Sequence, residues 1–118
     1  MRVSDWNECN ENNITRVVSI DTERANSLIE VSNARIKLIR EINQKNCNFV
    51  FEDYYTSLLE LLQALVLKAG YNVSNHLCLG YYLRDVLNRR DLYVIFDGLR
   101  YKRNSLTWQN LQLKLLEI

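Results

Sequence analysis

The fold is decided by one stretch, residues 49–70, which reads FVFEDYYTSLLELLQALVLKAG. Its large apolar side chains recur every three or four residues and form one wide face of a helix. Glu52 and Asp53 complement the positive end of the helix dipole, and Gly70 is suited to follow the last turn. We therefore predict a helix from after Asn48 to Gly70, the most buried of the chain, with Leu58, Leu62 and Leu65 in the core. Its apolar face comprises Phe51, Tyr54, Tyr55, Leu58, Leu59, Leu62, Leu65 and Val66, broadened by Leu61 and Leu67.

Further amphipathic segments flank this helix. Asp21 can cap a first helix of roughly 22 residues, and Ser74 can cap a third helix. A fourth helix follows the polar stretch 88–91, and a last segment could continue it as one kinked helix. The repeating positions are Ala25, Leu28, Ile29, Ser32, Ile36, Ile39 and Ile42 in the first helix; Leu79, Tyr82, Leu83, Val86 and Leu87 in the third; Leu92, Ile95, Phe96 and Leu99 in the fourth; and Trp108, Leu111, Leu115 and Ile118 in the last segment.

These segments predict an all-α fold. The chain has no proline and only three glycines, which is too little punctuation for the turns of a β-sandwich. Short connections make neighbouring helices antiparallel, so we expect an up-and-down bundle of four or five helices. Residues 22–118 would form this single domain. Residues 1–21 would be a partly ordered N-terminal arm, loose over the polar run 7–13, and the segment 14–20 fits a strand or a helix equally well.

Composition limits the function classes. The 118 residues are 47% hydrophobic, which suffices for one core, and 15 basic against 14 acidic residues leave a formal net charge of +1. The chain as a whole therefore has no polyanion-binding character. Any nucleic-acid site must be a local basic patch.

The cysteines and the apolar stretches point to a cytoplasmic protein. Cys9, Cys47 and Cys78 show no CxxC spacing, so we expect free thiols in a reducing compartment. His76 and Cys78 lie two residues apart and would point to different faces of a helix, so no metal site and no cofactor are expected. No stretch has the length of a signal peptide's apolar core or the ~20 apolar residues of a membrane span. We expect no membrane partner.

One segment carries candidate chemistry, residues 97–108, which reads DGLRYKRNSLTW. Arg100 and Arg103 are three residues apart and share a helix face with Asp97, and guanidinium groups suit phosphate oxygens. Aromatic rings can stack on bases, and an amide can hydrogen-bond a nucleotide. In the alternative interpretation, the basic residues only complement the helix dipole while Asp97 pairs with an arginine. The candidate RNA- or nucleotide-binding residues are Arg100, Tyr101, Lys102, Arg103, Asn104 and Trp108.

The single histidine, His76, is the candidate proton donor or acceptor. In the alternative interpretation it packs or caps locally at the start of a helix. Four tyrosines fall on the apolar stripes and are interpreted as packing rather than as a cofactor site. They are Tyr54, Tyr55, Tyr81 and Tyr82.

The order of these elements resembles the HEPN superfamily of small helical-bundle proteins, especially its compact prokaryotic members. The resemblance is carried by the helix end LLQALVLKAG, a short loop, His76 within SNHLCLGYYL, and a helix that ends in FDGLRYKRN. It covers residues 22–118. It implies a bundle that pairs into a homodimer, with an RNA-cleaving or nucleotide-handling cleft near the interface. Many members are ribonuclease toxins, and others are partners of a minimal nucleotidyltransferase in a toxin–antitoxin pair.

The family motif is Arg, a polar residue, three further residues and His. Arg103 and Asn104 match its first two positions, while Trp108 stands at the position of the His. An indole cannot transfer the protons of RNA cleavage. The modifiable tyrosine that some members carry shortly after the His is also missing, since Gln109 and Asn110 stand there.

Three hypotheses about function follow. In the first, the chain is a HEPN-like module that binds RNA or a nucleotide as a homodimer, with or without a nucleotidyltransferase-type partner. In the second, it is a metal-independent ribonuclease toxin, in which Arg103, Asn104 and His76 are the catalytic residues. In the third, it is a non-catalytic protein-interaction bundle whose basic turn binds an acidic surface.

Overall fold

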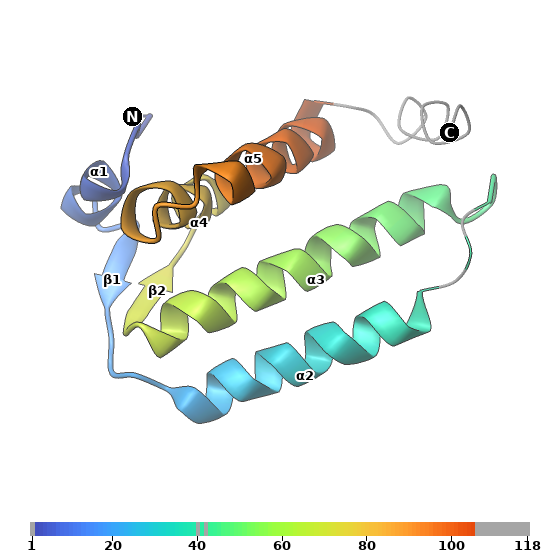
Figure 1. The fold of residues 1–118 in the computed structure, drawn as a ribbon, viewed down its shortest axis with the longest axis horizontal. Helices are drawn as coiled ribbons and strands as arrows, with labels where there is room; N and C mark the ends of the chain where they lie inside the picture. Colours follow the sequence, from blue (N-terminus) through green and yellow to red (C-terminus); the bar gives the residue numbers. More distant parts are fainter. Residues whose placement is uncertain (1, 40, 42, 106–118) are drawn as a thin grey trace.

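The computed structural model describes residues 2–39, 41 and 43–105 (Figure 1). This part of the chain is mainly helical, which confirms the predicted helical class, although a small two-stranded sheet was not expected. In chain order the elements are α1 (Trp6–Glu11), β1 (Thr15–Val17), α2 (Thr22–Leu38), α3 (Cys47–Lys68), β2 (Tyr71–Val73), α4 (His76–Tyr81), one turn of π-helix, η1 (Tyr82–Val86), and α5 (Arg90–Ser105).

Helices α2 and α3 form an antiparallel pair (Figure 1). Asp21 caps α2 as predicted, since its side chain accepts a hydrogen bond from the Arg24 N–H at 2.9 Å. The helix ends at Leu38, earlier than expected. Small buried residues lie between the two helices, and the Ser32 hydroxyl donates to the Ser57 carbonyl at 3.0 Å. This bond crosses the interface and fixes the register of the pair.

Helix α3 is buried on two sides. One side carries Leu62 in the main core, and the other carries Ala64 and Leu67 against α2. Leu58 is partly buried beside the main core, whereas Leu65 is 37% exposed. The prediction was therefore right for Leu62 and wrong for Leu65, because Leu65 falls between the two buried sides.

The turn after α3 starts the small sheet. Gly70 follows the helix as expected and has a φ of +86°, a conformation that glycine adopts without strain. It leads into β2, which pairs antiparallel with β1, with Thr15 opposite Val73 and Val17 opposite Tyr71. The segment 14–20, which fits either a strand or a helix by its sequence, therefore contains a strand.

Helix α4 begins one residue later than predicted. Asn75 rather than Ser74 is its cap and accepts the Cys78 N–H at 2.8 Å. The Ser74 hydroxyl donates instead to the Ile14 carbonyl at 3.1 Å, next to the sheet. Ile14 directly precedes β1 and is 60 residues from Ser74, so the sequence around Ser74 could not predict this hydrogen bond.

Helix α5 lies alongside α3 (Figure 1). The rings of Phe96 and Tyr55 stack with centroids 6.3 Å apart, and Phe96 is buried. Ile95, which shares the predicted apolar stripe, is 61% exposed. Trp108 and the rest of the last predicted segment lie outside the described residues.

The N-terminal residues are packed on α4 and η1, so the expectation of a loose run at 7–13 was wrong. The Trp6 N–H donates to Asp85 at 2.9 Å, and the Tyr81 hydroxyl donates to the Val3 carbonyl at 3.1 Å. Only two of the six residues of α1 are buried, Trp6 and Cys9. Because its composition is mostly polar, the sequence pattern did not predict this helix.

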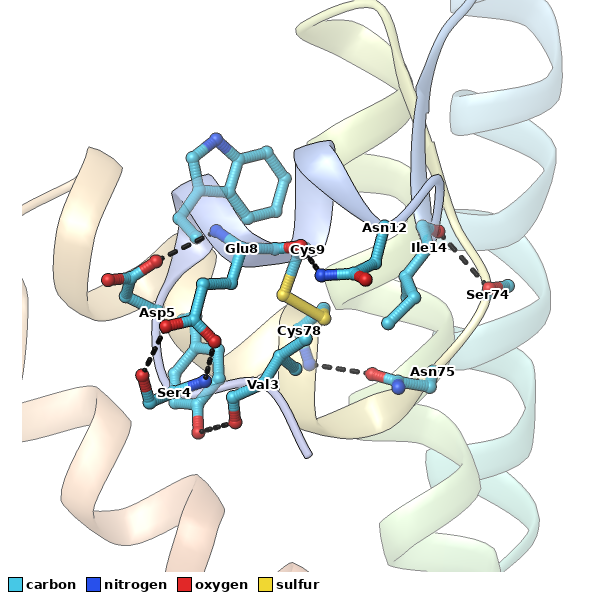
Figure 2. The surroundings of a disulfide bond; sticks show 12 residues. Val3, Ser4, Asp5, Glu8, Cys9, Asn12, Ile14, Ser74, Asn75 and Cys78 are labelled. Carbon is cyan, nitrogen blue, oxygen red and sulfur yellow. Dashed lines mark hydrogen bonds between the residues drawn. A yellow bond between two sulfur atoms is a disulfide. The ribbon is translucent and has the colours of Figure 1, made fainter. Parts of the chain in front are cut away.

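A disulfide joins Cys9 in α1 to Cys78 in α4 (Figure 2). The expectation of free thiols was therefore wrong for these two residues, while Cys47 is a buried thiol. The pair is 69 residues apart, so the spacing of the cysteines gave no sign of it. Because disulfides persist in oxidising compartments, the thiol argument for a cytoplasmic location no longer holds.

Candidate functional site

His76 is the first residue of α4 and is held in place by α3. Its Nδ1 lies 3.1 Å from the hydroxyl of Tyr55, whose side chain is buried in the core. The two rings are tilted, with centroids 5.8 Å apart. Asn75 fixes the backbone beside it through the helix cap. The only histidine is therefore oriented by a core residue of a neighbouring helix.

The protonation of this pair follows from burial. Burial raises the pKa of Tyr55, so its hydroxyl keeps its proton and can donate. Burial, and then the charges of Arg103 and Arg100, lower the pKa of His76, so the imidazole is neutral at pH 7. We infer that Tyr55 donates to Nδ1, which places the ring proton on Nε2. His76 then offers an N–H donor to a ligand.

Arg103 is engaged by two groups of α3. Its guanidinium donates to the carboxylate of Glu52, with Nη2 at 3.0 Å and Nε at 3.3 Å from Oε1. It also lies over the ring of Tyr55, with Cζ 5.0 Å from the centroid. Through Tyr55, therefore, Arg103 and His76 belong to one cluster.

Arg100 lies one turn earlier on α5 and pairs with Asp97, as the alternative interpretation of the sequence proposed. Its Nε and Nη2 lie 3.2 Å and 3.0 Å from one oxygen of that carboxylate. Both contacts go to the same oxygen, so the pair is not the two-oxygen fork of a bidentate contact. The partner is on the same helix, three residues away.

His76 and Arg100 line one open hollow of about 380 Å³. The remaining lining residues are Ser74, Asn75 and Leu77, all near the start of α4. The hollow thus brings together an imidazole and a guanidinium that are 24 positions apart in the sequence. It offers hydrogen-bond donors of the kind that bind an anionic oxygen.

The other predicted residues are less informative. Tyr101 and Lys102 lie on the exposed side of α5, and Tyr101 is 67% exposed. Asn104 is in the last turn of α5, but its side chain and the whole of Trp108 lie outside the described residues. The structure therefore brings together His76, Arg100 and Arg103 from the predicted set.

Sequence reasoning missed two members of the cluster, Glu52 and Tyr55. Glu52 was interpreted as a complement to the helix dipole and Tyr55 as packing. They are three residues apart, so they lie on one face of α3, and that face turns toward α5. The sequence did contain one indication of their role, because a carboxylate and a hydroxyl lie on an otherwise apolar helix face.

Two features are absent from the described part of the chain, a cluster of metal ligands and a membrane-spanning helix. It contains no group of three or more His, Cys, Asp or Glu side chains that could hold a metal ion. No helix among the same residues is long and apolar enough to cross a bilayer. Comparison of the chain with models of protein families, with curated proteins and with solved structures found no match.

Proposed function

We propose that the chain binds phosphate groups of RNA or of a nucleotide at the hollow between α4 and α5. The single observation that supports this proposal best is the convergence of His76 and Arg100 on one open hollow. A guanidinium donates charge-assisted hydrogen bonds to phosphate oxygens, and the Nε2–H of a neutral imidazole adds another donor. Arg103 is linked to His76 by Tyr55, whose ring contacts the guanidinium and whose hydroxyl contacts the imidazole.

The tautomer inferred for His76 favours binding over cleavage. Strand cleavage needs a group that removes the 2′-OH proton, and an imidazole that already carries its proton on Nε2 cannot accept another there. Ribonuclease activity is a second candidate, and the lowered pKa of His76 is the observation in its favour. It would require the opposite tautomer, in which Nδ1–H donates to Tyr55 and Nε2 is the base.

Binding is tested by fluorescence anisotropy with a short fluorescein-labelled single-stranded RNA, and with ATP as competitor to distinguish a polymer site from a mononucleotide site. Arg100→Ala should weaken RNA binding roughly ten- to a hundredfold, as expected for one charge-assisted contact of about 1.5–3 kcal/mol. It should also make the salt dependence shallower, because fewer counterions are released.

The control is Arg89→Ala. Arg89 pairs with Asp91 on the exposed surface at 2.9 Å, so its loss removes the same charge away from the hollow. Equal affinities for the wild type and Arg100→Ala would contradict the proposal. RNA cleavage that disappears in His76→Ala would replace it with the ribonuclease candidate.

The HEPN relationship, the up-and-down bundle, the homodimer and the nucleotidyltransferase-type partner belong to the same proposal. The alternating directions of α2, α3 and α5 support the bundle (Figure 1). Val94 and Ile95 are each 61% exposed on α5, which supports pairing through the C-terminal half. Light scattering tests the homodimer, and the identity and co-purification of the neighbouring gene's product test the partner.

A further inference from the structure

Arg100 and Arg103 are paired with carboxylates in different ways. Asp97, the partner of Arg100, is on the same helix. Glu52, the partner of Arg103, comes from α3, 51 residues earlier in the chain. The ion pair of Arg103 therefore joins two helices, and it occupies the group that a phosphate would need.

We propose that Glu52 is an internal competitor of the ligand: it occupies the guanidinium of Arg103 in the ligand-free protein, and a bound phosphate displaces it. The inference rests on the proposed function and adds to it a mechanism of regulation. It makes Arg103 a second contact to the phosphate, which forms only after the carboxylate has moved.

The contact geometry is that of a competitor. Both Glu52 oxygens lie within hydrogen-bond distance of Arg103 Nε, at 3.3 Å and 3.4 Å, and one of them also accepts from Nη2 at 3.0 Å. A phosphate presents paired oxygens to a guanidinium in the same manner. The two anions therefore cannot hold this edge of the guanidinium together.

Exposure makes the exchange inexpensive. The side chains of Arg103 and Glu52 are 32% and 33% exposed, so water and ligand reach the pair. Ion pairs that water reaches contribute little to stability, because solvent screens their charges. A phosphate can thus replace the carboxylate without opening the core.

Arg103 has a second contact besides Glu52. Its guanidinium lies over the ring of Tyr55, and the hydroxyl of that ring holds His76. When the carboxylate leaves, this stacking still links Arg103 to the ring whose hydroxyl holds the histidine. The carboxylate is therefore not the only group that holds Arg103 at the site, and its negative charge opposes an incoming phosphate.

The test is the affinity of Glu52→Gln for the labelled RNA, with ATP as a second ligand. We expect binding roughly two- to fivefold tighter than that of the wild type, the change that follows from removing one partly exposed competing ion pair. The gain should vanish when Glu52→Gln is introduced into Arg103→Ala, because no guanidinium is left to release.

The control is Asp53→Asn. The carboxylate of Asp53 lies 3.8 Å from Arg35 of α2. The substitution therefore removes the same charge on another side of α3. Its affinity should equal that of the wild type. If Glu52→Gln fails to fold by circular dichroism, Glu52→Asp takes its place, because the shorter side chain withdraws the carboxylate from Arg103; it too should bind more tightly.

The outcomes separate this inference from the proposed function. Tighter binding that requires Arg103, or binding that appears only in Glu52→Gln, supports the competitor role. Unchanged or weaker binding, with Arg100→Ala still impaired, overturns that role and leaves the proposed function intact. A gain equal to that of Asp53→Asn, or one that persists in Arg103→Ala, also overturns it. Absence of binding in both the wild type and Glu52→Gln overturns both proposals.

Discussion

The hydroxyl of Tyr55 lies 3.1 Å from Nδ1 of His76 and connects the core to the candidate site. Tyr55 is only 2% exposed and stacks on Phe96, so its position is fixed by the packing of α3 against α5. His76 takes its orientation from this buried group. Substitutions that change the packing of α3 should therefore change the orientation of His76.

Tyr55→Phe should reduce RNA affinity several-fold while the protein stays folded. The substitution keeps the stacked ring but removes the donor to Nδ1, so the imidazole loses its fixed tautomer and orientation. The free energy of unfolding should fall by about 1 kcal/mol, the usual contribution of a hydrogen bond. Anisotropy and urea denaturation measure the two effects.

Tyr81→Phe is the matched control for this prediction. It removes a tyrosine hydroxyl that donates to the Val3 carbonyl at 3.1 Å, away from the hollow. A similar loss of stability with unchanged RNA affinity is expected. If the two variants bind RNA equally, Tyr55 does not position His76 for the ligand.

The free energy of unfolding should fall as the pH drops through 6.5, the ordinary pKa of the histidine. Burial and the neighbouring arginines lower the pKa of His76 in the folded protein, whereas the unfolded chain takes up a proton near 6.5. Below 6.5 the unfolded state therefore binds more protons, so it is favoured until the pH reaches the folded pKa. Urea denaturation at several pH values measures the slope.

His76→Gln should remove this slope. The two proteins are compared above the titration of the carboxylates, whose ordinary pKa is 3.8 for aspartate, so that protonation of these groups does not contribute. A wild-type curve that is flat through pH 6.5, or one that His76→Gln leaves unchanged, would show that the histidine has the same pKa in both states.

Much of the helical framework could be predicted from local patterns. The cap at Asp21 and the glycine at 70 act within a few residues of the chain, so the sequence contains them in full. Exposure was harder to predict, because the stripes of α3 and α5 do not reveal how many neighbours each helix has. Leu65 was therefore placed in the core, and Ile95 on the apolar stripe of its helix, although both side chains are exposed.

The candidate site was predictable only in part. The arginines are adjacent on one turn of helix, but their link to His76 passes through Tyr55 on another helix. The disulfide and the strand pairing likewise join residues far apart in the sequence. Such relationships depend on tertiary packing, and the periodicity of apolar residues along the sequence contains no information about them.

Removing the disulfide should destabilise the protein strongly. It closes a loop of 69 residues, and the loss of this constraint on the unfolded chain corresponds to about 4 kcal/mol in the chain-entropy model. The double variant Cys9→Ala/Cys78→Ala should therefore unfold at lower urea concentration. A reductant should shift the wild type toward the variant and leave the variant itself unchanged; equal midpoints for the oxidised wild type and the variant would contradict this account.

The two glycines at 70 and 98 should respond to alanine with opposite signs. At Gly70 the φ is +86°, and an added Cβ would lie 3.3 Å from the Val18 carbonyl oxygen, so Gly70→Ala should cost about 1–2 kcal/mol. Gly98 is inside α5, and nothing in the described residues lies within 4 Å of its added Cβ. Gly98→Ala should therefore stabilise the helix by about 1 kcal/mol, since glycine is a poor helix former.

The response at Gly98 also bears on the proposed homodimer. Gly98 is one turn from Val94 and Ile95, which are exposed in the single chain. Thermal unfolding of Gly98→Ala is measured at low and high protein concentration, because only a dimer makes the midpoint depend on concentration. Stabilisation at both concentrations is the expected result for an open helix face. Destabilisation that appears only at high concentration would show instead that a second chain packs against the glycine.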